Sequence, residues 1–295
     1  MRFPCIKKAV NVAMLRQRCI FPLLITFTFS IAQAKAQDFV REELRIPYQQ
    51  AGPKGLQALL IKPAAAGRYP LAIINHGSPR DRAERAKMMP SSFARQAEEF
   101  AKRGWTTVIV MRRGYGNSAG EYAESTGCNN ADYVTVGRAG AADIRAAIEF
   151  LKSRPDVDPG RIISVGQSAG GFSSVALTEN APGGLVAVIN FAGGRGSRKP
   201  DEVCAPERLI GAFAEFGKKS STPMLWIYAQ NDRYFSAALS RKFHEAFVKA
   251  GGKAEYSLQP AFGDDGHRLF ARGVKLWTPA VDEFLRKQDL PALPR

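Results

Sequence analysis

Short apolar segments rich in β-branched residues alternate with amphipathic segments along most of this chain, and this alternation most constrains its fold. Gly, Asn or Asp follows several of the apolar segments, and Gly or Pro ends several of the segments with helical periodicity. Buried strands that alternate with helices form a mostly parallel sheet with helices on both faces. We therefore expect an α/β fold with a doubly wound, mostly parallel sheet.

Eight segments are expected to be strands: residues 39–48, 55–63, 70–77, 105–112, 161–166, 184–194, 223–232 and 254–260. Five are expected to be helices: residues 91–104, 131–154, 168–180, 236–252 and 272–288. The first two strands have the pattern of a hairpin, and Pro279 is expected to kink or divide the last helix. Residues 195–222 interrupt the alternation. We expect them to form a small cap-like insertion over the carboxyl ends of the strands, where ligands bind in such sheets.

Residues 1–36 are typical of a secretory signal peptide. Basic residues come first, an apolar run over 19–31 follows, and small residues come last. The run is shorter than the roughly 20 residues that span a membrane, although an uncleaved anchor remains the alternative. We expect cleavage after Ala36 or Ala34.

Cleavage there would leave residues 37–295 as one exported domain, periplasmic or secreted, with no stable membrane anchor. A start at Met14 instead of Met1 would give a more usual signal length, and the start site stays open. Six of the 42 basic residues lie in residues 1–36, so the domain carries 36 basic and 27 acidic residues. This charge favours solubility and attraction to anionic molecules. The basic residues are scattered, so no nucleic-acid partner is expected.

Cys128 and Cys204 are the two cysteines that follow residue 36. An exported compartment permits disulfides, and a single pair fits one bridge, which would tie the insertion to the loop after residue 112. Two buried free thiols are the alternative. Neither cysteine has a second Cys or a His at ligand spacing, so we expect no metal site.

The segment RIISVGQSAGG places Gly166-x-Ser168-x-Gly170 directly between a predicted strand and a predicted helix. Glycines at both positions let backbone segments pass close to a sharply turned serine, which raises its hydroxyl above the sheet. We expect Ser168 to be a nucleophile, the alternative being a serine that caps the helix.

A serine nucleophile needs a base and an acid that orients the base. His267 follows the final predicted strand and is the expected base, because a late histidine fits the chain order Ser, acid, His. His244 lies within a predicted helix and is expected at the surface. Asp232 follows a strand at the same edge as Ser168 and is the expected acid. Asp264 and Asp265 are expected to shape the loop of His267 instead.

An oxyanion hole requires two backbone donors. We expect the N–H groups of Ala169, which follows the nucleophile, and of Ser78, with Gly77 as the alternative to Ser78. His76 is expected to brace this loop through a ring hydrogen bond, or simply to be buried with its polar atoms satisfied.

These motifs together resemble the α/β-hydrolase superfamily, above all its dienelactone-hydrolase-like and prolyl-oligopeptidase-like branches. The matching segments are NHGSP, RRGYGNSAG, GQSAGG, ND at 231–232 and DDGH at 264–267. The resemblance covers most of the domain outside residues 195–222. It implies a metal-independent hydrolase with Ser168, Asp232 and His267 as the triad. Dienelactone hydrolases themselves use a cysteine nucleophile, so their substrate is not carried over to a chain with Ser168.

The stretch RRGYGNSAG also imitates a dinucleotide-binding motif, with Gly114, Gly116 and Ala119 after a strand. That motif should open a helix directly, whereas here a loop follows, so no cofactor is expected. We expect the loop to line the pocket and Arg113 and Tyr115 to contact the substrate; Arg112 and Arg113 could favour a carboxylate, although solvated arginines are commoner.

The sequence thus predicts an exported serine hydrolase that acts on a small-molecule carboxylic ester. The same residues would serve a peptidase of the prolyl-oligopeptidase type. A basic binding protein on an inactive hydrolase fold is the non-enzymatic alternative. The oligomeric state stays open.

Overall fold

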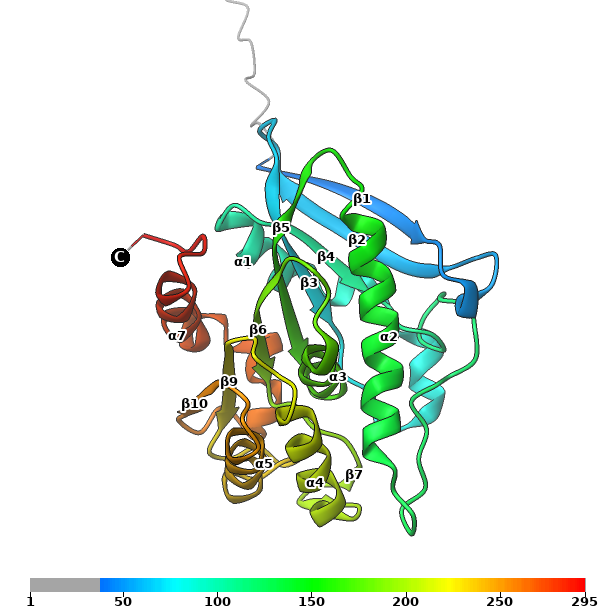
Figure 1. The fold of residues 1–295 in the computed structure, drawn as a ribbon, viewed down its shortest axis with the longest axis vertical. Helices are drawn as coiled ribbons and strands as arrows, with labels where there is room; N and C mark the ends of the chain where they lie inside the picture. Colours follow the sequence, from blue (N-terminus) through cyan, green and yellow to red (C-terminus); the bar gives the residue numbers. More distant parts are fainter. Residues whose placement is uncertain (1–37, 295) are drawn as a thin grey trace, which may run out of the picture. The chain divides into compact units, whose positions relative to one another are not determined.

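A computed structural model describes residues 38–294 of the 295-residue chain. The predicted signal peptide and the choice between Met1 and Met14 lie outside these described residues. The described part contains an eight-stranded sheet in the order β1-β2-β4-β3-β5-β6-β9-β10 (Figure 1). Strand β2 pairs antiparallel with β1 and β4, and every other pairing in this sheet is parallel.

Each expected strand and helix is present, with ends that differ by a few residues. The strands of the main sheet are β1 (Phe39–Ile46), β2 (Leu56–Pro63), β3 (Tyr69–Asn75), β4 (Thr106–Val110), β5 (Val157–Gln167), β6 (Leu185–Phe191), β9 (Met224–Ala229) and β10 (Ala254–Gln259). The helices are α1 (Ala94–Lys102), α2 (Tyr133–Leu151), α3 (Ala169–Leu177), α4 (Pro206–Gly217), α5 (Ala237–Lys249), α6 (Leu269–Arg272) and α7 (Val274–Lys287). Short 3-10 helices cover Gln49–Ala51, Arg82–Lys87, Pro90–Phe93, Thr178–Asn180 and Gly266–Arg268.

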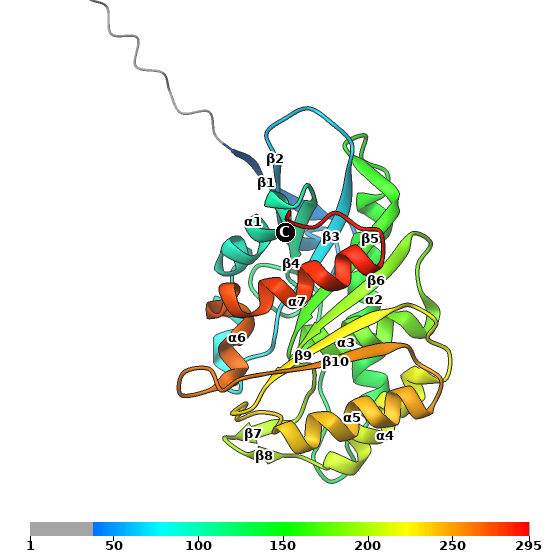
Figure 2. The same ribbon diagram turned by 90° about the vertical axis from the view of Figure 1, so that its left-hand side faces the viewer.

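The helices form two layers, one on each face of the sheet. Helices α1, α6 and α7 cover one face (Figure 2), and α2 to α5 cover the other. Successive side chains of the central strands enter opposite cores: Ile73 packs with the α2–α5 layer, whereas Ile74 packs with the α1–α7 layer. This arrangement explains why the central strands are continuous apolar runs, because strands covered on both faces cannot place polar side chains at alternate positions.

The segment 195–222, expected to be a small cap-like insertion, consists mostly of regular secondary structure. A two-stranded hairpin of β7 (Ser197–Lys199) and β8 (Glu202–Val203) is followed by α4. Helix α4 packs its buried Phe213 against Phe172 of α3 and Trp226 of β9. It is therefore part of the layer that covers the sheet. The amphipathic pattern of α4 was missed because polar residues surround the short hairpin before it.

The last helix, α7, is continuous through Pro279, so of the two expected effects, a kink or a division, the division does not occur. Proline lacks only one backbone donor, and the apolar face of α7 stays buried through Trp277, Val281 and Phe284. None of the helices within residues 38–294 is both long and apolar enough to cross a membrane.

A disulfide joins Cys128, in the loop between β4 and α2, to Cys204, between β8 and α4. The Cα atoms lie 5.4 Å apart, and the two residues are separated by 76 positions in the sequence. The bridge thus links two loops at the carboxyl edge of the sheet.

Reduction of this bridge is expected to destabilise the domain by about 2–4 kcal/mol, because it releases a long loop in the unfolded chain. Urea unfolding with and without reductant measures the effect, and alkylation followed by intact-mass analysis counts the free thiols. Full alkylation before reduction, or equal stability afterwards, would contradict this expectation.

Candidate active site

Ser168 lies at the sharp turn between β5 and α3. Its backbone has φ 54° and ψ −118°, a conformation that a residue with a side chain rarely adopts. Its exposure is 6%, yet it lines a pocket of about 680 Å³. A strained serine that is held above the end of a strand is the arrangement expected of a nucleophile elbow.

The two flanking glycines explain how this turn closes. A Cβ atom on Gly166 would lie 2.3 Å from the carbonyl oxygen of Gly170. A Cβ on Gly170 would lie 2.1 Å from the carbonyl oxygen of Asn75, at the end of β3. Neither position can hold a larger residue without moving backbone, so the spacing of the motif reflects close packing of β3, β5 and α3.

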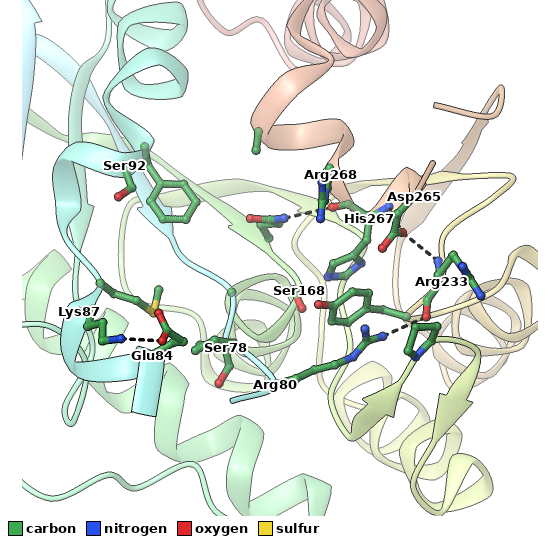
Figure 3. Close-up of a pocket in the computed structure, with 18 of the residues that line it drawn as sticks. Ser78, Arg80, Glu84, Lys87, Ser92, Ser168, Arg233, Asp265, His267 and Arg268 are labelled. Atoms are coloured by element: carbon green, nitrogen blue, oxygen red, sulfur yellow. Dashed lines mark hydrogen bonds and ion pairs between the residues drawn. The ribbon is translucent and has the colours of Figure 1, made fainter. Parts of the chain in front are cut away.

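His267 and Asp232 meet beside this pocket. The Nδ1 atom of His267 lies 3.0 Å from Oδ2 and 3.2 Å from Oδ1 of Asp232. Asp232 also accepts hydrogen bonds from the backbone N–H groups of Tyr234 at 2.7 Å and Phe235 at 2.9 Å, which fix its carboxylate. The imidazole of His267 points toward the Ser168 hydroxyl (Figure 3). The three candidate triad residues therefore converge from β5, β9 and the loop after β10.

Asp265 connects the loop of the acid to the loop of the base. Its Oδ1 accepts hydrogen bonds from the backbone N–H of Arg233 and of His267, both at 3.0 Å. This matches the loop-shaping role expected for Asp265. Asp264 lines the pocket without a hydrogen bond from its side chain to the described residues.

The ring of Tyr234 and the guanidinium of Arg80 stack in series on the imidazole of His267 and support it. The ring of Tyr234 lies parallel to it, with centroids 3.8 Å apart and an interplanar angle of 9°. The guanidinium of Arg80 covers the ring of Tyr234, 3.5 Å from its centroid. No sequence motif predicts this stack, because Arg80 and Tyr234 come into contact only when the loops after β3 and β9 meet in the folded protein.

The candidate oxyanion donors lie on either side of Ser168. A Cβ on Gly77 would be 3.1 Å from the Cβ of Ser168, so the loop after β3 passes directly beside the nucleophile. Ser78, Ala169 and Ser168 line one small side pocket. The backbone N–H groups of Ser78 and Ala169 make no hydrogen bond within residues 38–294, so both are free to bind a ligand.

His76 holds this loop in place through ring hydrogen bonds, which is one of the two roles expected from the sequence. Its Nε2 accepts a hydrogen bond from the backbone N–H of Arg112 at 3.1 Å, so its Nδ1 carries the proton and donates to the Gly77 carbonyl at 2.7 Å. Complete burial and the positive charge of Arg112 lower the pKa of His76 to about 3. The ring is therefore neutral at physiological pH.

Lowering the pH from 6.5 to 5 is expected to cost about 2 kcal/mol of stability through His76. The unfolded chain binds a proton there, whereas the folded chain does not until the pH approaches 3. Urea unfolding at several pH values measures the slope. His76→Gln should flatten it, because an amide can make the same two hydrogen bonds without titrating. An equal slope in His76→Gln would show that another group is responsible.

A buried ionic cluster lies behind the loop of His76. Glu124 accepts hydrogen bonds from Arg112 and from Arg195, the latter at 2.7 Å, and from the hydroxyl of Tyr115 at 3.1 Å. Burial alone would raise the pKa of Glu124, but the charges of Arg112 and Arg195 lower it to about 2. Arg112 in turn donates to the His76 carbonyl at 2.9 Å. The cluster thus anchors the candidate oxyanion loop.

Arg113 and Tyr115, expected to contact the substrate, are engaged elsewhere. Arg113 binds Asp143 of α2 through both its backbone N–H and its Nε, each at 2.7 Å. Tyr115 is fully buried, and its ring packs edge-on against His76. Neither residue lines the pocket of Ser168, because the chain turns inward after β4 and carries both side chains away from it.

His244 and the segment after Gly114 lie where the sequence predicted them, the first on a helix and the second in a loop. His244 lies on α5, half-buried, and its Nε2 contacts the Ala254 carbonyl at 2.8 Å. The segment that begins at Gly114 continues as loop until Tyr133, where α2 begins. It lines a groove beside the candidate site through residues 122–128.

The pocket has a volume of about 680 Å³ and is open to solvent (Figure 3). Its walls come from the loops after β3, β5, β9 and β10 and from the tip of the β7–β8 hairpin. No cluster of three or more His, Cys, Asp or Glu side chains suited to a metal ion occurs within residues 38–294. What the arrangement offers is a hydroxyl, an imidazole, a carboxylate and two free backbone donors at one rim.

Comparison with known proteins agrees with this geometry. Residues 54–200 match the family of X-Pro dipeptidyl-peptidases (S15 family). Two curated proteins of Mycobacterium tuberculosis, both described as uncharacterized, are 30% identical over 118 residues, which is 40% of this chain. The match spans about a third of those relatives, 34% of their length.

Solved structures match over a longer part of the chain. An esterase of Pyrococcus furiosus is 17% identical, with a TM-score of 0.60 over 84% of this chain and 93% of its own. An esterase of Thermogutta terrifontis, phosphorylated by paraoxon, is 17% identical, with a TM-score of 0.57 over 86% and 96%. The acylaminoacyl peptidase of Pyrococcus horikoshii is 18% identical, with a TM-score of 0.62 over 88% of this chain and 43% of its own.

The fold and these matches agree with the resemblance seen in the motifs. The fold is shared with structures that align over more than four fifths of the chain. The chain therefore has the α/β-hydrolase fold.

Proposed function

We propose that this protein is an exported enzyme that hydrolyses a carboxylic ester with Ser168, His267 and Asp232 as its triad. The observation that carries the proposal is the position of His267, which contacts Asp232 through Nδ1 at 3.0 Å while its ring points toward Ser168. The signal-like segment 1–36 and the disulfide between Cys128 and Cys204 support export, since such bridges persist in oxidising compartments.

The proposed reaction has two halves. In the first, Oγ of Ser168 attacks the ester carbonyl while Nε2 of His267 takes its proton, and the new oxyanion accepts hydrogen bonds from Ser78 and Ala169. The intermediate collapses when His267 protonates the leaving alcohol. In the second, His267 deprotonates a water that attacks the acyl-enzyme, and Ser168 leaves with the proton returned. Asp232 holds the imidazole in the required tautomer throughout, and no step needs a metal ion.

A peptidase is the second candidate, and the match to the X-Pro dipeptidyl-peptidase family favours it. The same triad cleaves amides when the leaving amine can be protonated. The open pocket of about 680 Å³ accepts either kind of substrate. We place the ester first because the two esterase structures align with nearly their whole length, whereas the peptidase aligns over 43% of its own.

A fluorophosphonate probe and a paired substrate panel test the proposal. The probe should label wild-type protein at Ser168, located by mass spectrometry of the modified peptide. Short p-nitrophenyl esters should be cleaved faster, relative to their spontaneous hydrolysis, than aminoacyl-anilides. Preferred cleavage of the anilides would favour the peptidase. An unlabelled, inactive protein that is correctly folded would leave only a binding protein on this fold.

A further inference from the structure

Arg80 is a half-buried guanidinium beside the candidate nucleophile that has no carboxylate partner within residues 38–294. Its Nη2 donates to Ser197 Oγ at 2.8 Å and to the Arg233 carbonyl at 3.1 Å, and its Nε donates to Ser197 Oγ at 3.2 Å. Its Nη1 donates to no atom of these residues. Neutral acceptors and the ring of Tyr234 hold Arg80 in place without neutralising its charge.

Among the other cations that line the main pocket, Arg268 is exposed to solvent, and Lys87 and Arg233 are paired. Lys87 lies 2.8 Å from Glu84, and Arg233 lies 2.7 Å from Asp201. Arg80 differs because it also lines a side pocket of about 140 Å³ to which Arg195 contributes and where the described residues include no acid. An unneutralised guanidinium at a partly buried site favours an anionic ligand.

The groove that continues from this side pocket has the same sign of charge. Arg82, Arg85 and Arg198 line it on the way to the disulfide. Among the described residues, the acid that lines this groove is Glu124. It already binds two arginines. The field at the side pocket is therefore positive.

The position of the candidate base determines which part of the substrate lies in each of the two pockets. His267 lines the main pocket and does not line the side pocket, whereas Ser168 lines both. The leaving alcohol must lie within reach of His267 to receive its proton. The side pocket beside Ser78 and Ala169 is then left for the acyl group. Its volume of about 140 Å³ is about the volume that five water molecules occupy in the liquid, which suits a short acyl chain.

We propose that the acyl group carries a carboxylate at its far end and that Arg80 binds this carboxylate in the side pocket. The substrates are then half-esters of short dicarboxylic acids. This inference rests on the proposed ester hydrolysis and adds the chemical class of the acyl group. Arg195 strengthens the positive field, but Glu124 holds its guanidinium, so Arg80 makes the direct contact.

The test compares monoethyl glutarate with ethyl pentanoate, which share the leaving group and the acyl chain length and differ in the terminal carboxylate. Hydrolysis is followed by titrating the released acid at constant pH. For wild-type protein, kcat/KM should favour the anionic ester by about tenfold or more, as expected for a charged hydrogen bond. Arg80→Gln should reduce this ratio by about tenfold, and Arg80→Lys should retain part of it.

A matched control is Arg161→Gln, which removes the same charge from an exposed arginine in β5, toward the end of the strand opposite Ser168. It should leave the ratio unchanged, and added salt should lower the wild-type ratio because it screens the ionic contact. A wild-type preference for ethyl pentanoate, or an equal loss for both esters in Arg80→Gln, would overturn the inference while ester hydrolysis stands. Failure to cleave either ester, together with an unlabelled Ser168, would overturn the proposed function and this inference with it.

Discussion

Ser168→Ala is expected to lower kcat/KM for ester hydrolysis by about four to six orders of magnitude and to abolish labelling by a fluorophosphonate. Removing the nucleophile of a triad removes the covalent path, so only the oxyanion donors and substrate binding remain. The fold should be retained, because alanine differs from serine by one oxygen atom and keeps the same backbone at φ 54°. Thermal unfolding of the variant checks this point.

Ser173→Ala is the matched control for this loss. Ser173 lies in α3, five positions after Ser168, and its buried hydroxyl has no hydrogen-bond partner within residues 38–294. Its removal should leave both activity and labelling unchanged. Residual labelling of Ser168→Ala at a second serine, or activity close to that of the wild type, would show that the nucleophile lies elsewhere.

Glu124→Gln is expected to destabilise the protein by about 3–5 kcal/mol, the cost of removing one partner from a buried ion pair. Arg112 and Arg195 would keep their charges in a buried site where Glu124 now balances part of them. The lowered pKa of Glu124, about 2, is consistent with this size, because it reflects the same stabilisation of the carboxylate. Urea unfolding at pH 7 measures the difference.

Glu121→Gln removes the same charge from an exposed position of the same loop and should change stability by less than about 0.5 kcal/mol. Adding Arg195→Met to Glu124→Gln should recover part of the loss, because one of the two unbalanced buried charges is then gone. If Glu124→Gln unfolds at the same urea concentration as the wild type, the ionic cluster does not stabilise the fold.

The alternation of strands and helices could be predicted well because it depends on local properties. Central strands such as β4 are short runs of β-branched residues, and helix α1 has one buried stripe, so pattern and length suffice to identify them. Helix α4 was not predicted, because it follows a hairpin of two short strands and no local pattern separates it from the loop. The sheet order follows from this alternation and the resemblance, because short connections restrict the topology.

The candidate triad could be inferred because chain order and strand ends restrict the choice. Three histidines were available, and His267 alone follows the last strand. The substrate contacts could not be inferred in this way. Arg113 and Tyr115 follow a strand just as Asp232 does, but the loop after β4 turns inward, and Asp143 and Glu124 bind them there.

By itself, the sequence determined the order of the elements, the nucleophile turn and the residues that can form a triad, because periodicity, glycine spacing and position relative to strand ends are local features. Only the tertiary structure decided which arginines are buried, paired or left facing the nucleophile. The charge balance around Ser168 depends on partners more than 70 positions apart, such as Arg195 with Glu124 and Arg80 with Ser197. Such pairs form only when separate loops meet at one edge of the folded sheet.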